Sequence, residues 1–273
     1  MSDTTPVPSG DDAGDGDELA GTEAPLLEHL VELRKRIMYA LLAVGTLFVG
    51  FFFIADHLFD FLLGPFKAAT GNIEDVRLIY TAPQEYFFTQ LSVALFFAVA
   101  LAFPFLAAQI YAFVAPGLYK KERKAFLPYL MATPVLFLAG AALVYYVVMP
   151  LAMRFFLAME VGGPESISIQ METRVSEYLG LVMTLLLAFG VCFQLPVVLT
   201  LLARIEVINS QQLKSWRKYA VVAVLVVAAF LTPPDPISQI GLALPMLLLY
   251  EMSILSVRLV ERRRARNSDV ADA

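Results

Sequence analysis

Apolar runs about as long as a lipid bilayer is thick recur along this chain, and they constrain its fold more than any other feature of the sequence. Roughly 20 consecutive apolar residues cross the hydrocarbon core as one helix. The first run, residues 37–55, contains no charged residue. Only 16% of the 273 residues are charged, whereas a soluble domain has about 25%. The sequence therefore predicts an all-α integral membrane protein.

We expect six transmembrane helices in one bundle that covers residues 26–258. Their predicted bounds are 37–55, 84–113, 125–149, 177–203, 219–232 and 237–257. The fifth helix is expected to be short, because its apolar run makes only about 20 Å of helix against about 30 Å of hydrocarbon. The sixth is expected to be short because Glu251 interrupts its apolar run. Two short neighbouring helices imply a locally thin bilayer or cover by other protein.

The segments outside the bundle are polar. Residues 1–25 are predicted to be a disordered acidic tail, because residues 1–28 contain eight Asp and Glu and no Lys or Arg, which leaves too little apolar surface to offset the entropy of ordering. Residues 259–273 are predicted to be a basic, polar tail. Six spans place 16 of the 20 Lys and Arg on the side that holds both termini. Because cytoplasmic loops are rich in Lys and Arg, both termini are expected in the cytoplasm.

Turn and cap residues predict where several segments begin. The short apolar piece 58–63 is too short to cross a bilayer and is predicted to lie at its surface. Thr81 to Gln84 forms a capping-box pattern with a proline in the first turn, which starts the second span. Residues 150–176 are predicted to be a long loop. Asp235 is the expected N-cap of the sixth helix, with a proline directly after it.

Two carboxylates lie next to basic residues at the cytoplasmic surface. Residues 26–37 have the apolar spacing of a helix, and Glu32 lies one turn before Arg36. Glu122 lies among four Lys and Arg in residues 114–124. Carboxylates at this end of a bundle suit the capture of a cationic peptide. The alternative is that they only form ion pairs at helix ends.

Other functional classes lack the residues that they need. No enzyme is expected, because the two histidines, His29 and His57, lie at opposite ends of the first helix and no Gly-x-Ser-x-Gly motif occurs. The single cysteine, Cys192, indicates neither an intrachain disulfide nor a metal site. The main alternative is a proton-coupled small-solute transporter. Such a transporter is expected to bury charged residues near the membrane midplane, but the polar residues within these spans are mostly uncharged.

Five stretches, in order, carry a resemblance to a known family. They are HLVELRKR (29–36), FVAPGLYKKER (113–123), FGVCFQLP (189–196), LTPPDPISQ (231–239), and Pro245 with Tyr250 and Glu251. Pro65 matches a further proline in the first outer loop of that family. In register on six spans, these stretches resemble TatC, the polytopic core subunit of the twin-arginine (Tat) protein translocase.

The resemblance implies a receptor that is not an enzyme and has no cofactor. Its cytoplasmic face would bind signal peptides with consecutive arginines, and its complex would move folded proteins by means of the proton-motive force. Glu32 and Glu122 match the two glutamates that the family uses for the arginine pair. The other residues implied at this signal-peptide site are His29, Arg34, Phe113, Pro116 and Leu118.

The resemblance also implies partners within the cytoplasmic (inner) membrane. They are the single-span subunits TatA and TatB, further copies of this chain and membrane lipid, with no nucleic acid. The residues implied in docking partner helices are Gln194, Gln239, Asp235 and Pro65. Gln194 stands where the family often has glutamate, so it keeps hydrogen bonding without a titratable group. It either contacts a partner helix or packs with its amide satisfied within the chain.

Overall fold

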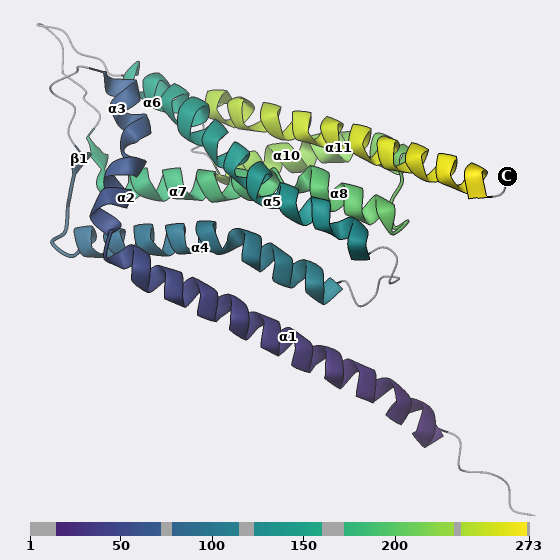
Figure 1. Ribbon diagram of the computed structural model, residues 1–273. Coiled ribbons are helices and arrows are strands. Elements are labelled where there is room, and N and C mark those ends of the chain that lie inside the picture. Colours follow the sequence, from purple (N-terminus) through teal and green to yellow (C-terminus); the bar gives the residue numbers. More distant parts are fainter. Residues whose placement is uncertain (1–14, 72–77, 115–122, 160–171, 232–235, 272–273) are drawn as a thin grey trace, which may run out of the picture.

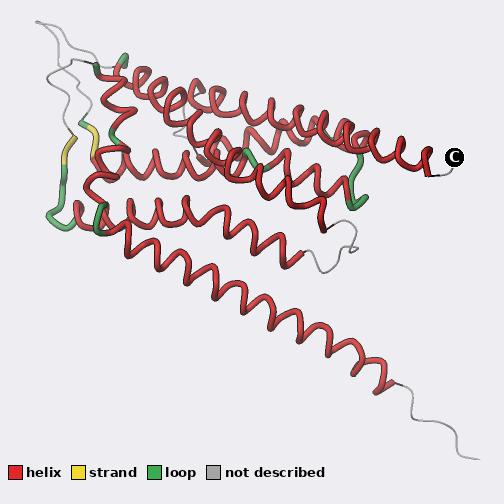
Figure 2. The backbone as a smooth tube through the Cα atoms, in the orientation of Figure 1, coloured by secondary structure: helices red, strands yellow, loops and turns green. Residues whose placement is uncertain are grey.

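Helices make up almost all of the described chain (Figures 1 and 2). The computed structural model describes residues 15–71, 78–114, 123–159, 172–231 and 236–271. The long helices are α1 (Asp15–Phe52), α4 (Glu85–Val114), α5 (Arg123–Leu143), α7 (Val175–Cys192) and α11 (Pro236–Ala271). The shorter ones are α2 (Ala55–Leu62), α3 (Gly64–Thr70), α6 (Met149–Leu157), α8 (Leu195–Arg204), α9 (Ser210–Ser215) and α10 (Arg217–Leu231), and a π-helical turn, Val144–Val148, joins α5 to α6.

Five segments of the described chain are long and apolar enough to cross a membrane. They are His29–Phe52, Glu85–Phe113, Leu130–Leu157, Val175–Arg204 and Gln239–Arg264. The remaining predicted span corresponds to α10, whose 15 residues make a helix about 22 Å long. The predicted class, an all-α integral membrane protein, is confirmed, and α10 is short as expected.

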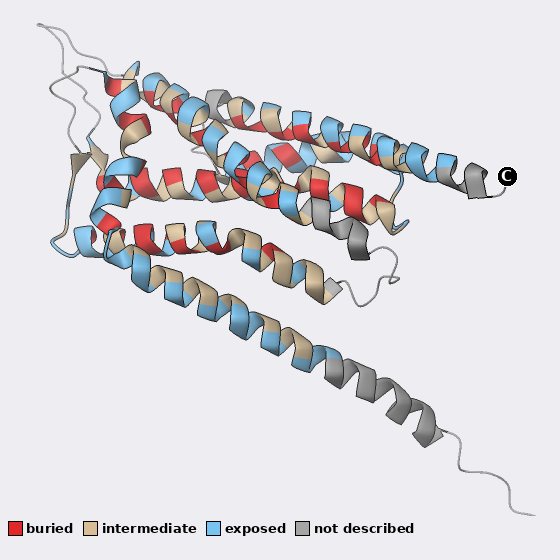
Figure 3. Cartoon of the chain, in the orientation of Figure 1, coloured by how far each residue is buried: buried red, intermediate tan, exposed pale blue. Residues whose placement is uncertain are grey.

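Helix α7 lies at the centre of the bundle. Its buried side chains, among them Leu179, Val182 and Phe189, belong to the main apolar cluster, and the helix contacts α4, α5 and α10. Apolar side chains such as Leu101 and Leu138 are exposed on the outside of the bundle, and Figure 3 shows this alternation of buried and exposed faces along the long helices. Exposed apolar side chains on the spans suit contact with lipid.

Two glycines allow α5 and α7 to approach closely. A Cβ atom at Gly190 would lie 2.6 Å from Cδ2 of Phe137, and one at Gly140 would lie 2.6 Å from the carbonyl oxygen of Phe189. Neither position has room for a larger residue unless a neighbour moves. Small residues at helix contacts are the usual means of close packing between membrane helices.

Two tyrosines fix α2 and α3 across one end of the bundle, which we call the outer end. The hydroxyl of Tyr178 donates to the carbonyl of Leu62 at 3.2 Å and accepts from the backbone N–H of Phe66 at 3.1 Å. Tyr145 donates to the carbonyl of Phe61 at 2.7 Å. Residues 58–63, which were predicted to lie at the membrane surface, are therefore helical as far as Leu62 and hydrogen-bonded to Tyr145 and Tyr178 of the spans.

The cap of α4 differs by one residue from the predicted box. The backbone N–H and the hydroxyl of Thr81 donate to Oε2 of Glu85 at 2.9 and 3.1 Å, whereas Gln84 was the predicted partner. Ser176 donates to the other oxygen of buried Glu85 at 2.5 Å. Beside this cap, strands β1 (Leu78–Ile79) and β2 (Thr173–Arg174) pair in parallel. The two outer connections are therefore joined, which the sequence did not indicate.

Two helices extend further than predicted. Helix α1 begins at Asp15, so residues 15–25, predicted to be disordered, are helical, and acidic residues in a first turn favour a helix N-terminus. Helix α11 continues to Ala271, so the sixth helix is not short. Its polar extension is held by Glu261, which accepts a hydrogen bond from the backbone N–H of Ser210 at 2.7 Å.

The third helix passes through the first residues of the predicted second loop. Helix α6 carries Pro150 in its first turn and ends at Leu157, so residues 150–157 are helical. A proline inside an α-helix clashes with the carbonyl four residues before it. Here the carbonyl four residues before Pro150 belongs to Tyr146, within the π-helical turn Val144–Val148, where the backbone spacing differs from that of an α-helix.

Candidate functional site

The carboxylate predicted to bind a cationic peptide lies beside an arginine of its own helix. Nε and Nη2 of Arg36 donate to the same oxygen, Oε1 of Glu32, at 3.0 and 2.5 Å. The Glu32 side chain is 33% exposed and that of Arg36 is 22% exposed. Within the described chain, Oε2 of Glu32 has no hydrogen-bond partner. The predicted ion pair forms, but it uses only one of the two carboxylate oxygens.

Helix α4 completes this site from the opposite side. Nη1 of Arg36 also donates to Oε1 of Gln109 at 3.4 Å. The rings of His29 and Phe113 stack with their centroids 4.2 Å apart. Gln109 lies one turn before Phe113, and His29 lies one turn before Glu32, so each helix presents one face to the other. These contacts lie where α4 ends, which we call the inner end of the bundle (Figure 1).

Gln109 was not assigned to the site from the sequence. A polar residue one helical turn from Phe113 is the signal that would have identified it. Arg34, which was assigned to the site, is exposed and makes no hydrogen bond or ion pair within the described residues. The structure therefore brings together His29, Glu32 and Phe113, and leaves Arg34 apart from them.

Three predicted site residues, Glu122, Pro116 and Leu118, lie outside the described residues. The helix ends that flank them are described. Helix α4 ends at Val114 and α5 begins at Arg123, and both ends lie at the inner end of the bundle with Glu32 (Figure 1).

Gln194, a predicted docking residue, lies at the bend between α7 and α8. Its backbone N–H bonds to the carbonyl of Val191 at 2.9 Å in place of the carbonyl of Gly190, four residues before it. The side-chain amide instead donates to that Gly190 carbonyl at 3.3 Å and to the carbonyl of Thr133 on α5 at 3.1 Å. Gln194 is 6% exposed, and its Oε1 has no hydrogen-bond partner in the described chain.

The other docking candidates lie in separate parts of the structure. Pro65 is buried in the first turn of α3 at the outer end. Gln239 is partly exposed and donates to the carbonyl of Leu225 on α10 at 3.2 Å. Asp235 lies outside the described residues. Of the described candidates, Gln239 alone is accessible at the outside of the bundle.

Comparisons with known proteins agree on one family. Residues 28–245 match the family described as Sec-independent protein translocase protein (TatC). The protein TatC of Magnetococcus marinus is 44% identical over 92% of this chain and 90% of its own length. The protein TatC of Escherichia coli is 35% identical over 86% of this chain and 88% of its own length.

The fold also matches that of a solved structure. A crystal structure of the twin arginine translocase receptor TatC superposes with a TM-score of 0.74 at 34% sequence identity, over 85% of this chain and 99% of that chain. The chain belongs to the TatC family of Sec-independent protein translocase proteins.

Proposed function

We propose that this chain is the signal-peptide receptor of a twin-arginine translocase and binds paired arginines at the inner end of its bundle. The family is that of a translocase component, and a related structure is called a receptor. In this proposal the inner end faces the cytoplasm, with both termini, and the bundle spans the inner membrane. The concentration of Lys and Arg at that side supports this orientation.

The open oxygen of Glu32 is the observation that carries the proposal. Because Arg36 bonds to Oε1 and no described residue bonds to Oε2, an incoming guanidinium has Oε2 as an acceptor. A guanidinium is a planar fork of donors that suits carboxylates, whereas the ammonium group of lysine is a point charge. A close pair at a surface with an effective dielectric near 20 gains about 4 kcal/mol of Coulomb energy before desolvation.

Glu122 is proposed as the acceptor for the second arginine of the pair. The ends of α4 and α5 that flank it lie at the inner end with Glu32. Pro116 and Leu118 are proposed to shape the same surface, together with Phe113 and its stacking partner His29. Arg34, exposed on α1, is proposed to contact the peptide outside the arginine pair.

The edge formed by α10 and the start of α11 is proposed to dock partner helices. Helix α10 has only two buried side chains, Val224 and Ala228, and Phe230 near its end is 87% exposed. We propose that the single-span subunits TatA and TatB dock here, with Gln239 and Asp235 as polar contacts, and that copies of this chain associate in the complex. Gln194 and Pro65 would act indirectly, by shaping the helices that partners contact.

The arrangement of buried polar groups supports a receptor more than a proton-coupled solute transporter. In the described spans, Gln194, Thr133 and Ser253 are buried and uncharged. Glu85 is buried and ionisable, but it lies at the end of its span. Solute uptake into liposomes driven by a pH gradient, without any peptide, would favour the transporter.

Peptide binding tests the proposed receptor. A labelled signal peptide with Arg-Arg, and the same peptide with Lys-Lys, would be titrated against the purified full chain. The variants are Glu32→Gln and Glu122→Gln, and the control is Glu206→Gln, which removes a carboxylate paired with Arg264 elsewhere at the inner end. We expect a preference for Arg-Arg that both variants lose and the control keeps. Equal binding of both peptides, unchanged in the variants, would refute the proposal.

A further inference from the structure

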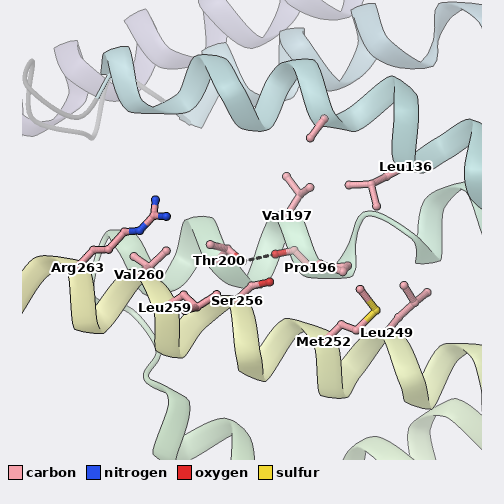
Figure 4. Close-up of a pocket in the computed structure, with 11 residues that line it drawn as sticks. Leu136, Pro196, Val197, Thr200, Leu249, Met252, Ser256, Leu259, Val260 and Arg263 are labelled. Atoms are coloured by element: carbon pink, nitrogen blue, oxygen red, sulfur yellow. Dashed lines mark hydrogen bonds between the residues drawn. The ribbon is translucent and has the colours of Figure 1, made fainter.

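A groove of about 390 Å³ lies between α5, α8 and α11. Figure 4 shows Leu136 of α5 and Val197 of α8 between α5 and α8, with Arg263 rising from α11 at one end. Met252 and Leu259 of α11 line the groove and are 49% and 57% exposed, so it opens to the outside of the bundle. Its lining is apolar over most of its length and basic at the inner end.

The length of the groove suits an extended hydrocarbon chain. Its α11 residues run from Leu249 to Arg263, which spans about 21 Å along the helix axis. These residues run from near the middle of the span Gln239–Arg264 to its end. In a bilayer with about 15 Å of hydrocarbon in each leaflet, the groove would then reach from the midplane to the headgroup level.

The charge at the inner end favours an anionic ligand. Residues 204–218 and 251–266 contain nine Lys and Arg and three Glu. Each of these glutamates already has a partner within the chain: Glu206 pairs with Arg264, Glu251 with Arg217, and Glu261 bonds to Ser210. Arg263 forms no ion pair with any described residue, so its charge is available to a ligand at the headgroup level.

We propose that this groove binds one anionic phospholipid, with an acyl chain along α11 and the phosphate at Arg263. Basic pockets between transmembrane helices on the cytoplasmic side are suited to anionic headgroups. The bound lipid would fill the space between α5 and α11, so that it acts as a fixed part of the bundle near the proposed receptor site. The proposal depends on the groove and its arginine, and not on peptide binding at Glu32.

Lipid retention by the purified full chain tests this inference. The protein would be equilibrated in mixed micelles with equal amounts of phosphatidylglycerol and phosphatidylcholine, and the bound lipids would be counted by native mass spectrometry. Arg263→Gln removes the charge that lines the groove. Arg262→Gln is the matched control, because it removes the same charge from an exposed neighbour that does not line the groove. Ser256→Phe and Met252→Trp narrow the groove without changing its charge.

We expect the wild type and Arg262→Gln to retain phosphatidylglycerol over phosphatidylcholine by roughly fivefold, the ratio that corresponds to about 1 kcal/mol per basic residue. Arg263→Gln should lose the preference, and the two narrowing variants should retain less of either lipid. Equal losses in Arg262→Gln and Arg263→Gln would overturn the proposal in favour of diffuse surface charge. Full retention by both narrowing variants would also overturn it.

A photo-crosslinker at Leu259 in native membranes separates the lipid from a protein occupant. We expect it to capture phospholipid, because the groove is apolar over most of its length and ends at the charge of Arg263. Capture of a single-span protein helix in place of lipid would overturn the proposal and assign the groove to a partner subunit.

Discussion

The side-chain amide of Gln194 donates to the main-chain carbonyl of Thr133, 3.1 Å away, and so joins the bend between α7 and α8 to α5. The same amide bonds to the carbonyl of Gly190, which the backbone N–H of Gln194 does not reach. Pro196, two residues later, supplies no N–H to the helix. Residues 190–196 therefore contain both the bend and the side chain whose hydrogen bonds hold it in place.

Replacing Gln194 with methionine should destabilise the bundle. The variant Gln194→Met keeps a similar side-chain length but has no donors, so two buried carbonyls lose a partner, at a cost of about 1–3 kcal/mol. Thermal unfolding in detergent should show a lower midpoint. Gln211→Met, on exposed α9, is the control and should leave the midpoint unchanged. An unchanged midpoint in Gln194→Met would show that the amide does not hold the bend.

A methyl group at Gly190 should force α5 and α7 apart. The new Cβ would meet the ring of Phe137, which is buried and stacks on Phe103 with centroids 4.4 Å apart, so the ring has little room to move. Overpacking of this kind costs about 1–3 kcal/mol. Gly180→Ala is the matched control on the same helix, because nothing lies within 4 Å of its new Cβ. It should be neutral or stabilising, by at most about 1 kcal/mol.

The double variant provides the check on that mechanism. Phe137→Leu should recover part of the stability lost in Gly190→Ala, because the smaller side chain leaves room for the methyl group. Additive losses in the double variant would mean that the clash is not the cause.

Local sequence rules predicted the helical class, the short α10 and the pairing of Glu32 with Arg36, because each depends on residues close together in the chain. They could not predict the contact of Arg36 with Gln109, since those residues are far apart in sequence and meet only when α1 packs on α4. The β1–β2 pairing and the bond from Ser176 to Glu85 could not be predicted for the same reason, because they also join residues far apart in the sequence.

Some helix boundaries differ from the predicted ones because another interaction outweighs the local sequence signal. Pro150 predicted a helix end, but the π-helical turn before it allows the helix to continue. The polar residues after 257 predicted a tail, but Glu261 bonds to Ser210 and extends α11. Asn209 and Gln212 form a capping box at the start of α9, and their spacing is a signal that would have predicted this helix.

Removing Arg36 should strengthen binding of a twin-arginine peptide. Arg36 holds Oε1 of Glu32 and leaves the peptide Oε2 alone, so its removal frees both oxygens for a two-oxygen contact with a guanidinium. A partly exposed ion pair such as that of Arg36 and Glu32 is worth up to about 1 kcal/mol. Arg36→Gln should therefore raise the affinity for the Arg-Arg peptide by up to about fivefold. Lys35→Gln removes the same charge from the adjacent position, where the ammonium lies over the ring of Tyr39, and should not raise it. Weaker binding in Arg36→Gln than in Lys35→Gln would mean that Arg36 orients Glu32 for the peptide.

Acid should weaken the outer end through Asp56. The hydrogen bond from Gln90, and then that from Tyr86 at 2.8 Å, hold the pKa of Asp56 below its ordinary value of 3.8. A carboxyl whose pKa is lower in the folded state adds stability above its unfolded pKa, and this contribution is lost as the pH falls through the folded pKa. Above about pH 5 the wild type should therefore unfold at a higher temperature than Asp56→Asn by a constant margin.

That margin should shrink as the pH falls below the ordinary pKa of 3.8. Thermal unfolding of both proteins between pH 7 and pH 3, in the same detergent, measures it. Asp60→Asn on the same helix is the control, since Asp60 does not bond to Gln90 or Tyr86. A margin between the wild type and Asp56→Asn that stays constant down to pH 3 would show that the bonds to Asp56 do not favour its ionised form, because the contribution must disappear once the carboxyl is protonated in both states.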